Sequence, residues 1–153
     1  MNNSPDSITT TAPQADHRDA WERLYRGYAD YYQMAMTEEG LATVWGWIHD
    51  DAEPFHCRLA LSTSGEPVGL AHFRPMPSPL RGTRVGFLDD LFVDPVYRGS
   101  GAVEALFDAL KQEAKRQGWP LVRWITREDN YRGRAVYDKL AMHTNWQTYE
   151  LKL

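Results

Sequence analysis

Two adjacent carboxylates, Asp89 and Asp90, interrupt an apolar stretch, residues 87–93, that has the composition of a β-strand. A carboxylate beside an ammonium group can accept the proton that the nitrogen must lose before it acts as a nucleophile. Side chains alternate along a strand, so we expect Asp89 and Asp90 on opposite faces unless a bulge intervenes. Only one is then expected to face a reacting group. The alternative for each is a solvated or ion-paired strand carboxylate.

A glycine-rich turn follows the same strand and leads into an amphipathic helical pattern. Free N–H groups at a helix start, together with the helix dipole, attract anions, and glycines let the backbone approach a phosphate closely. The turn lacks the lysine of a P-loop. It also lacks the third glycine of a dinucleotide-binding motif, because Gly99-Ser100-Gly101 is followed by Ala102, Val103 and Glu104. The alternative is a surface turn before an ordinary helix.

The turn resembles the pyrophosphate loop of the GNAT acetyltransferase superfamily, whose pattern is Gln/Arg-x-x-Gly-x-Gly/Ala. Arg98, Gly101 and Val103 fall on the three defined positions, and Val103 departs from the last. Asp129-Asn130 and the run 135–140 are similar to the family's Asn…Leu-Tyr-x-Lys-x-Gly signature, although Met142 stands near the usual Gly-Phe. The run 87–93 with Tyr137-Asp-Lys resembles the branch that includes spermidine/spermine N-acetyltransferases.

The resemblance implies an enzyme that transfers an acetyl group from acetyl-CoA to a primary amine by direct attack in a ternary complex. The expected acceptor is a small molecule, such as a polyamine or an amino acid. Asp89 is the candidate base and Tyr137 the candidate acid for the departing thiolate, with a core tyrosine as the alternative for Tyr137. The residues implied to bind acetyl-CoA are Leu91, Phe92, Val93, Arg98, Gly99, Ser100, Gly101, Ala102, Val103, Asn130 and Arg134.

Some of these residues have equally simple structural roles. Asn130 can cap the helix that it precedes, and Arg134 can lie on a solvated face. The acceptor is expected near Asp90, Tyr28 and Tyr31, because aromatic rings can hold an alkylammonium by cation–π contacts of roughly 0.5–2 kcal/mol. Core packing is the alternative for the tyrosines. Two other functions remain open: acetylation of a protein or peptide amine, and a non-catalytic acyl-CoA-binding sensor.

The elements that must position these residues follow from periodicity and turn residues. Strands are expected over residues 8–11, 55–61, 68–73, 84–93, 121–126 and 146–153. Helices are expected over residues 17–34, from Thr37 to about residue 49, and over residues 101–117 and 130–140. Gly27 is a weak point of the first helix, and Pro75, Pro77 and Pro79 indicate a loop that cannot join a sheet.

This order predicts an α+β (mixed α/β) fold with a central, mixed and mostly antiparallel twisted sheet of six or seven strands and helices on both faces. Residues 1–7 are expected to form a disordered tail, and residues 8–153 a single domain. The apolar strand 146–153 at a sheet edge predicts a homodimer by strand exchange or edge pairing.

The composition of the chain argues against several classes of partner and site. The chain has 153 residues and a net charge of −4, which argues against a nucleic-acid partner and permits a cationic substrate. The single Cys57 excludes an internal disulfide, and the five histidines show no metal-binding spacing. No apolar run has membrane-spanning length and no leader pattern is visible, so we expect a cytosolic protein without a membrane partner.

Overall fold

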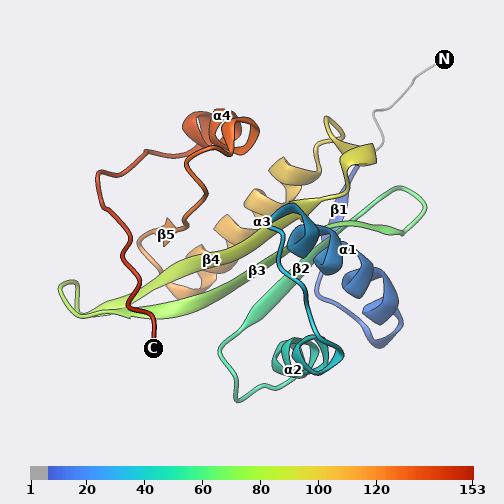
Figure 1. Cartoon of the computed structure of the whole chain (residues 1–153), viewed down its shortest axis with the longest axis horizontal. Coiled ribbons are helices and arrows are strands. Elements are labelled where there is room, and N and C mark those ends of the chain that lie inside the picture. The colour runs from blue at the N-terminus through green and yellow to red at the C-terminus, as the bar shows by residue number, and fades with distance from the viewer. Residues whose placement is uncertain (1–6) are drawn as a thin grey trace.

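A computed structural model describes residues 7–153 and shows one sheet with helices on both of its faces (Figure 1). The strands lie in the order β1-β2-β3-β4-β5, and all neighbours are antiparallel except β4 and β5. Their bounds are β1 (Thr9–Thr11), β2 (His56–Leu61), β3 (Pro67–Ser78), β4 (Thr83–Val93) and β5 (Val122–Arg123). The mixed, mostly antiparallel sheet is confirmed, but the described part of the chain has five strands rather than six or seven.

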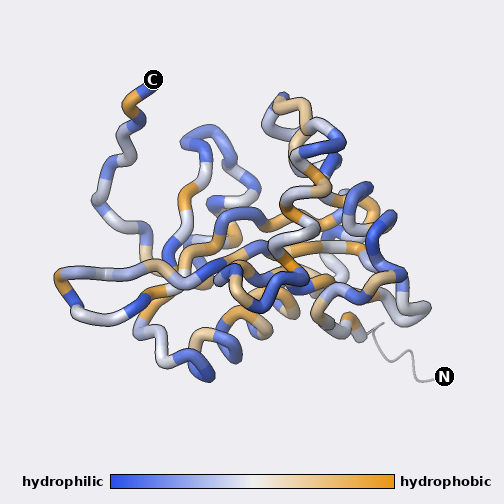
Figure 2. The backbone as a smooth tube through the Cα atoms, turned by 90° about the horizontal axis from the view of Figure 1, so that it is seen from below, coloured by the Kyte–Doolittle hydropathy of each residue, from blue (hydrophilic) through white to orange (hydrophobic). Residues whose placement is uncertain are grey.

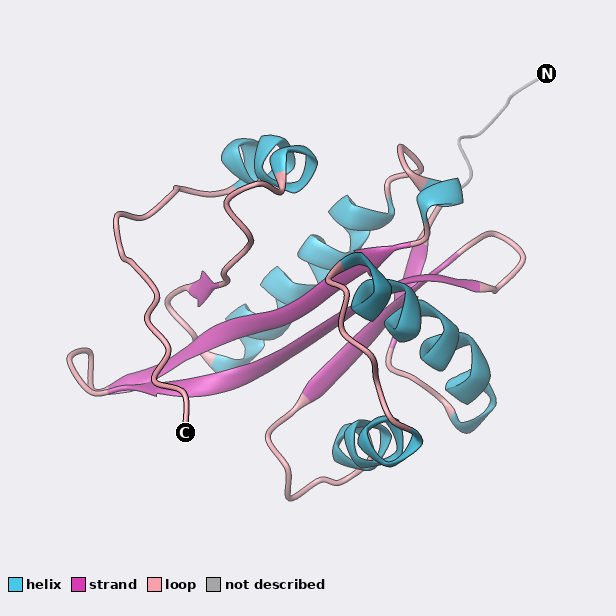
Figure 3. Cartoon of the chain, viewed as in Figure 1, coloured by secondary structure: helices cyan, strands magenta, loops and turns pink. Residues whose placement is uncertain are grey.

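The helices divide between the two faces of this sheet (Figure 3). They are α1 (Arg18–Tyr31), α2 (Glu38–Ile48), α3 (Ala102–Gln117) and α4 (Tyr131–Leu140). On one face, α1 and α2 pack against β2 and β3. The side chains buried there are Trp21 and Leu24 of α1 and Leu41 of α2. On the other face lies α3, which carries the chain across from β4 to β5 and thereby makes these two strands parallel.

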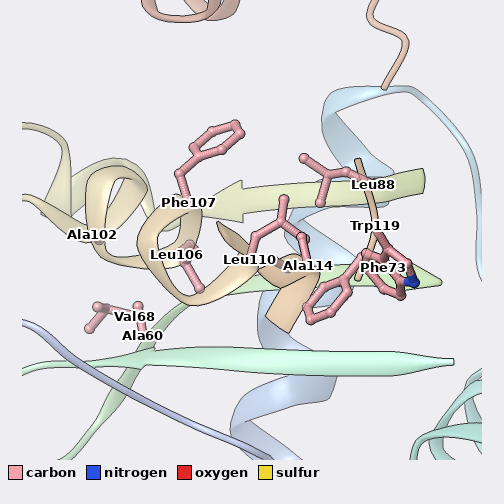
Figure 4. Close-up of a cluster of buried hydrophobic side chains, with 11 residues drawn as sticks. Ala60, Val68, Phe73, Leu88, Ala102, Leu106, Phe107, Leu110, Ala114 and Trp119 are labelled. Atoms are coloured by element: carbon pink, nitrogen blue, oxygen red, sulfur yellow. The ribbon is translucent and has the colours of Figure 1, made fainter. Parts of the chain in front are cut away.

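The cluster under α3 is the larger apolar core (Figure 4). Leu106 and Leu110 of α3 belong to one cluster with Phe73 of β3 and Leu88 of β4, and all four side chains are at most 3% exposed. Burying a side chain of this size contributes about 1.5–3 kcal/mol, so this cluster fixes α3 and the loop before it relative to the sheet. Tyr137 and Leu140 of α4 pack at the margin of the same cluster.

Local signals set the helix ends. Thr37 caps α2, since its hydroxyl accepts the Gly40 N–H at 3.0 Å. Gly118 ends α3 with a φ of 75°, as expected for a glycine after a helix. Gly27 does not break α1. Instead it makes room for β4, because an added Cβ would lie 2.9 Å from the Phe92 ring.

β4 contains a bulge at the two carboxylates. His72 pairs with Asp90 and Phe73 with Leu88, which leaves Asp89 without a partner on β3. The extra residue reverses the alternation of side chains along the strand. Leu88 and Leu91 therefore both pack on the α3 side, whereas Phe92 packs on the α1 side. A bulge was the stated exception to the prediction that Asp89 and Asp90 lie on opposite faces, and the strand adopts this bulged arrangement.

The prediction of a proline loop at residues 75–79 was wrong for Pro75 and Pro77, whereas Pro79 does lie in the turn that follows β3. β3 continues to Ser78, where Pro75 pairs with Gly86 and Pro77 with Arg84. The two prolines are two residues apart, so their missing N–H groups fall on the same edge of β3. β2 ends its pairing at Phe73, so that edge has no strand neighbour and loses no hydrogen bond.

The predicted strand at residues 146–153 was also wrong. Residues 141–153 are exposed and carry no regular secondary structure, and in Figure 2 they lead away from the body of the sheet. The strand predicted over residues 121–126 shrinks to Val122–Arg123. Of the predicted tail, residues 1–6 lie outside the described residues. Within residues 7–153, every helix is too short or too polar to cross a bilayer.

Candidate active site

The bulge of β4 forms one wall of a hollow of about 470 Å³. α1 and α2, the turn before β2, and strand β3 supply the rest of its lining. The lining residues are Tyr25, Val44, Trp47, Glu53, Pro54, Phe55, Arg74, Pro75, Asp89 and Asp90. Asp89 and Asp90 thus face the same space, because the bulge cancels the alternation that would have separated them.

Asp90 is the end of a buried chain of hydrogen bonds. The Trp21 indole N–H donates to His72 Nε2 at 2.9 Å, and His72 Nδ1 lies 2.8 Å from Asp90 Oδ2. Tyr25 donates its hydroxyl to the same oxygen at 2.9 Å. An indole nitrogen can only donate, so His72 Nε2 must be the acceptor and Nδ1 must carry the proton given to Asp90.

This chain sets the charge of Asp90. Burial alone would raise its pKa, but the hydrogen bonds that it accepts from His72 and from the hydroxyl of Tyr25 hold the pKa below its ordinary value. Asp90 therefore stays ionised at neutral pH. Both of these hydrogen bonds end on Oδ2. Oδ1 is therefore the oxygen available to a ligand in the hollow, beside the Tyr28 hydroxyl, which also lowers the pKa of Asp90.

Asp89 is held differently. Its Oδ2 accepts from Arg74 Nε at 2.9 Å, and its side chain is one quarter exposed. Burial raises the pKa of Asp89 above its ordinary value, although the Arg74 guanidinium opposes the rise. A carboxylate with a raised pKa is the stronger base, and this favours Asp89 over Asp90 for proton abstraction.

A row of tyrosines runs along α1 from this hollow toward α4. The ring centroids of Tyr25 and Tyr28 lie 5.9 Å apart, and those of Tyr28 and Tyr32 lie 4.9 Å apart. Burial and the nearby Asp90 raise the pKa values of Tyr25 and Tyr28, so both hydroxyls remain donors. Tyr28 donates to the Asp89 carbonyl at 3.4 Å, and Tyr31 donates to Asn130 Oδ1 at 3.0 Å.

Tyr137 lies at the other end of this row. Its ring packs edge-on against Trp124 and Phe107, with centroid distances of 5.5 and 6.2 Å. Its hydroxyl makes no hydrogen bond to residues 7–153. Burial, followed by the neighbouring Tyr32 and Tyr31, raises the pKa of Tyr137 to about 12. The hydroxyl is therefore protonated at neutral pH and free to donate to a ligand.

The turn after β4 has the features of an anion site. Gly99 and Gly101 have φ values of 77° and 91°, and open space lies where a side chain would project from either. Gly101 provides no side-chain cap, so the N–H groups of the first turn of α3 stay free. The Ser100 hydroxyl is buried and has no partner among the described residues. An anion above the turn would satisfy these donors.

An open sheet edge leads from this turn to the hollow. β4 and β5 pair only at Gly86–Val122 and Phe87–Arg123. Beyond Phe87 the described chain places no strand on that side of β4, so the backbone of residues 91–93 is available to pair with an extended ligand. A ligand with an anionic end and an amide-bearing arm fits this path.

Asn130 and Arg134 both make hydrogen bonds to neighbouring residues of the chain. Asn130 caps α4 by accepting the Gly133 N–H at 3.2 Å, and its amide donates to Thr126 at 2.8 Å. The predicted alternative for Asn130 is thus realised, while its contact with acetyl-CoA remains a prediction. Arg134 donates to the Glu128 carbonyl at 2.7 Å and lines a second hollow of about 490 Å³.

Comparison with known proteins decides the family. The sequence profile of the acetyltransferase (GNAT) family matches residues 21–142, most of the chain. The chain belongs to the GNAT family.

Individual GNAT proteins cover almost its whole length. D-amino-acid N-acetyltransferase HPA3 from Saccharomyces cerevisiae is 26% identical over 95% of this chain and 91% of its own. Ribosomal-protein-alanine N-acetyltransferase from Brucella melitensis has a TM-score of 0.79 at 21% identity, covering 96% and 99% of the two chains. Aminoglycoside N-acetyltransferase AAC(6′)-Iy, solved with CoA, has a TM-score of 0.81 at 17% identity and covers 99% of both chains.

The GNAT assignment agrees with the geometry on the donor side. The free N–H groups, the orphaned Ser100 hydroxyl and the open edge of β4 suit the pyrophosphate and amide groups of acetyl-CoA. The protein is an acetyl-CoA-dependent N-acetyltransferase, and acetyl-CoA supplies the acetyl group as an activated thioester.

Sequence reasoning missed three side chains of this GNAT site. These side chains lie 15 to 69 positions away in the sequence from Asp89 and Asp90, and only folding brings them together. Arg74 bonds to Asp89, His72 bonds to Asp90, and Trp21 bonds to His72. The five histidines show no metal-binding spacing, so their pattern gave no reason to place one beside the carboxylates. One weak signal existed: His72 lies in the otherwise apolar run 68–73, where a buried polar group needs a partner.

Proposed function

We propose that the acceptor is the primary amine of a small molecule, acetylated by direct attack in a ternary complex. The observation that carries the proposal is the placement of two carboxylates of different character in one hollow at the open edge of β4. One carboxylate stays ionised and the other is a stronger base. An amine that arrives as an ammonium needs an anion that binds it and a base that removes its proton.

The roles follow from these surroundings. Oδ1 of Asp90 holds the ammonium, and Asp89 accepts its proton directly or through one water. The nitrogen lone pair then forms the C–N bond at the acetyl carbon while a backbone N–H of β4 stabilises the oxyanion. The C–S bond breaks as the intermediate collapses, and Tyr137 gives its proton to the thiolate. The second proton of the nitrogen leaves as the amide forms and returns through water to Tyr137. Tyr28 and Tyr31 border the path between the two substrates.

The comparisons support acetyl transfer and leave the acceptor open. By their names, the yeast relative acts on D-amino acids, and the solved neighbours act on a ribosomal-protein alanine and on aminoglycosides. One fold thus serves small-molecule and protein acceptors. The size of the hollow and its dense lining of side chains favour a small amine. We include a cytosolic location and one domain over residues 8–153 in the proposal.

A panel of amines screened for CoA release tests this function. The panel contains D- and L-amino acids, polyamines, aminoglycosides and a peptide with a free N-terminus. The expected result is turnover with a small amine and little with the peptide, and loss of that turnover in Asp89→Asn. Turnover with the peptide alone would contradict the small-molecule assignment. Binding of acetyl-CoA without turnover of any amine would instead indicate an acyl-CoA sensor.

We also propose that the protein is a homodimer. Residues 141–153 expose several large apolar side chains, among them Trp146 (76%), Tyr149 (91%) and Leu151 (88%). Exposed apolar segments of this length usually pair with a partner, and a second copy offers the free side of β5. Light scattering should report a dimer that becomes a monomer when residues 146–153 are deleted. A monomeric full-length protein at micromolar concentration would contradict the proposal.

A further inference from the structure

Arg74 places a positive charge in a hollow whose other charged groups are carboxylates. Its Nε donates to Asp89 at 2.9 Å, and its guanidinium carbon lies 5.0 Å from the centroid of the Phe87 ring. These two contacts hold the guanidinium plane in one orientation. The terminal nitrogens make no hydrogen bond to residues 7–153, and the side chain is 43% exposed.

A guanidinium fixed in this way is a carboxylate receptor. Its free N–H groups form a planar fork that matches the two oxygens of a carboxylate, and charge-assisted bonds of this kind are stronger than neutral ones. Arg74 lines the acceptor hollow together with Asp89 and Asp90. The hollow therefore offers one site for an anion and one for a cation.

The two charged sites are adjacent. Asp89 is hydrogen-bonded to Arg74, and Asp90 is the next residue along β4. A ligand that uses both sites must carry its ammonium and its anionic group close together, as an α-amino acid does across a single carbon. A polyamine has a second ammonium in place of the carboxylate, and Arg74 would repel it.

The rest of the lining is largely apolar. Val44 and Trp47 of α2, Pro54 and Phe55 of the following turn, and Pro75 of β3 form this part of the hollow. The rings of Trp47 and Phe55 meet edge-on at 5.9 Å. These residues form a surface against which an aliphatic or aromatic side chain can be buried.

We propose that the acceptor is an α-amino acid with an apolar side chain, whose carboxylate binds Arg74 while its ammonium binds Asp90 and its side chain packs on Trp47 and Phe55. This proposal rests on the function proposed above and names the substrate class of the same site. Arg74 is a specificity-determining residue: it binds a part of the substrate that takes no part in bond formation.

The first experiment compares three acceptors that differ only at the carboxylate. CoA release is measured with phenylalanine (both enantiomers), phenylalaninamide and phenethylamine, with putrescine as the diamine. The expected kcat/KM for the better phenylalanine enantiomer exceeds that for the amide and the amine by roughly 10- to 100-fold, the range for a charge-assisted hydrogen bond. Equal or better use of the amide, the amine or putrescine would overturn the proposal.

The second experiment assigns the preference to Arg74. In Arg74→Gln the ratio of kcat/KM between phenylalanine and its amide should fall to near one, while Arg74→Lys should keep part of it. Arg84→Gln, an exposed arginine on the same hairpin, should keep the full ratio. The ratio is the readout because loss of Arg74 also changes the pKa of Asp89, which alters turnover of all acceptors together. An unchanged ratio in Arg74→Gln would overturn the assignment.

A binding measurement separates the two levels of the proposal. With saturating CoA, phenylalanine should raise the melting temperature of the wild type more than its amide does, and this difference should vanish in Arg74→Gln. Turnover of amines lacking a carboxylate, with no such difference, would overturn only the amino-acid assignment. Absence of CoA release with every amine would overturn both this proposal and the proposed function.

Discussion

The proposed acceptor side and the proposed donor side of the active site are built from different parts of the chain. On the acceptor side, α1, β3 and β4 each contribute side chains to one hydrogen-bond chain, from Trp21 through His72 to Asp90 and Tyr25. On the donor side, consecutive residues after β4 offer mostly backbone N–H groups and one hydroxyl. A backbone site tolerates substitution and appears in the sequence as a local pattern, whereas a side-chain site is specific and assembles only on folding.

Tyr137 lies where the two sides meet, and its loss should have the largest effect. In Tyr137→Phe the ring remains, so packing on Trp124 and Phe107 survives while the hydroxyl that we propose as the proton donor is removed. Turnover should fall by ~10²–10⁴-fold with an unchanged acetyl-CoA dissociation constant. The matched variant Tyr149→Phe, in the exposed terminal segment, should behave as wild type. Full turnover in Tyr137→Phe would make this residue a core tyrosine only.

The backbone character of the donor side can be broken at Gly101. Gly101→Asp puts a side chain at a φ of 91° and a carboxylate beside the anion site, and acetyl-CoA affinity should fall by about 100-fold or more. Gly82→Asp is the control, because Gly82 has a φ of 63° in the β3–β4 turn, at the opposite end of β4. Equal affinities of the two folded variants in calorimetry would show that the phosphates bind elsewhere.

Ser100 contributes a side-chain hydroxyl to the donor side. Ser100→Ala removes a buried hydroxyl that has no partner in the described chain, so the free protein should unfold at the same or a slightly higher temperature. Acetyl-CoA affinity should nevertheless fall by about 10-fold, through loss of one hydrogen bond to a charged group. Thermal melts with and without acetyl-CoA measure both effects. Lower stability with unchanged affinity would mean that the hydroxyl has a structural role.

The smallest expected effect concerns the charge of Asp90. Its pKa is lowered in the folded protein, so ionised Asp90 stabilises the fold above its ordinary pKa of about 3.9, and this contribution disappears as pH falls through the lowered value. Asp90→Asn should therefore cost about 1–2 kcal/mol in urea unfolding at pH 7 and less near pH 3. The exposed Asp108→Asn is the control. A cost that is constant with pH would contradict the ionised network.

The two sides also explain what the sequence could predict. Arg98, the two glycines and the following helix lie together in the chain, so the glycine turn, α3 and the parallel crossover to β5 were predictable, while the binding of acetyl-CoA at this turn stays a prediction. His72 and Arg74 were not recognised, because neither residue type nor spacing shows which strand will lie beside which. Pro75 and Pro77 were misjudged because their effect depends on which edge of β3 they face. The terminal segment 146–153 alternates like a strand but lies apart from the sheet in one copy of the chain.

The bulge at Asp89 has a consequence for anyone who redesigns this enzyme. Because of the extra residue, odd positions before Asp89 and even positions after it share one face of β4. Phe87, Asp90 and Phe92 follow this rule and lie on the face of the acceptor hollow. Deleting Asp89 would remove the bulge and restore regular alternation along the strand. The side chains of one half of β4 would then change faces, which would move either a core leucine or a carboxylate to the wrong face. Libraries that alter acceptor choice should therefore vary odd positions before residue 89 and even positions after it, and should never change the length of this strand.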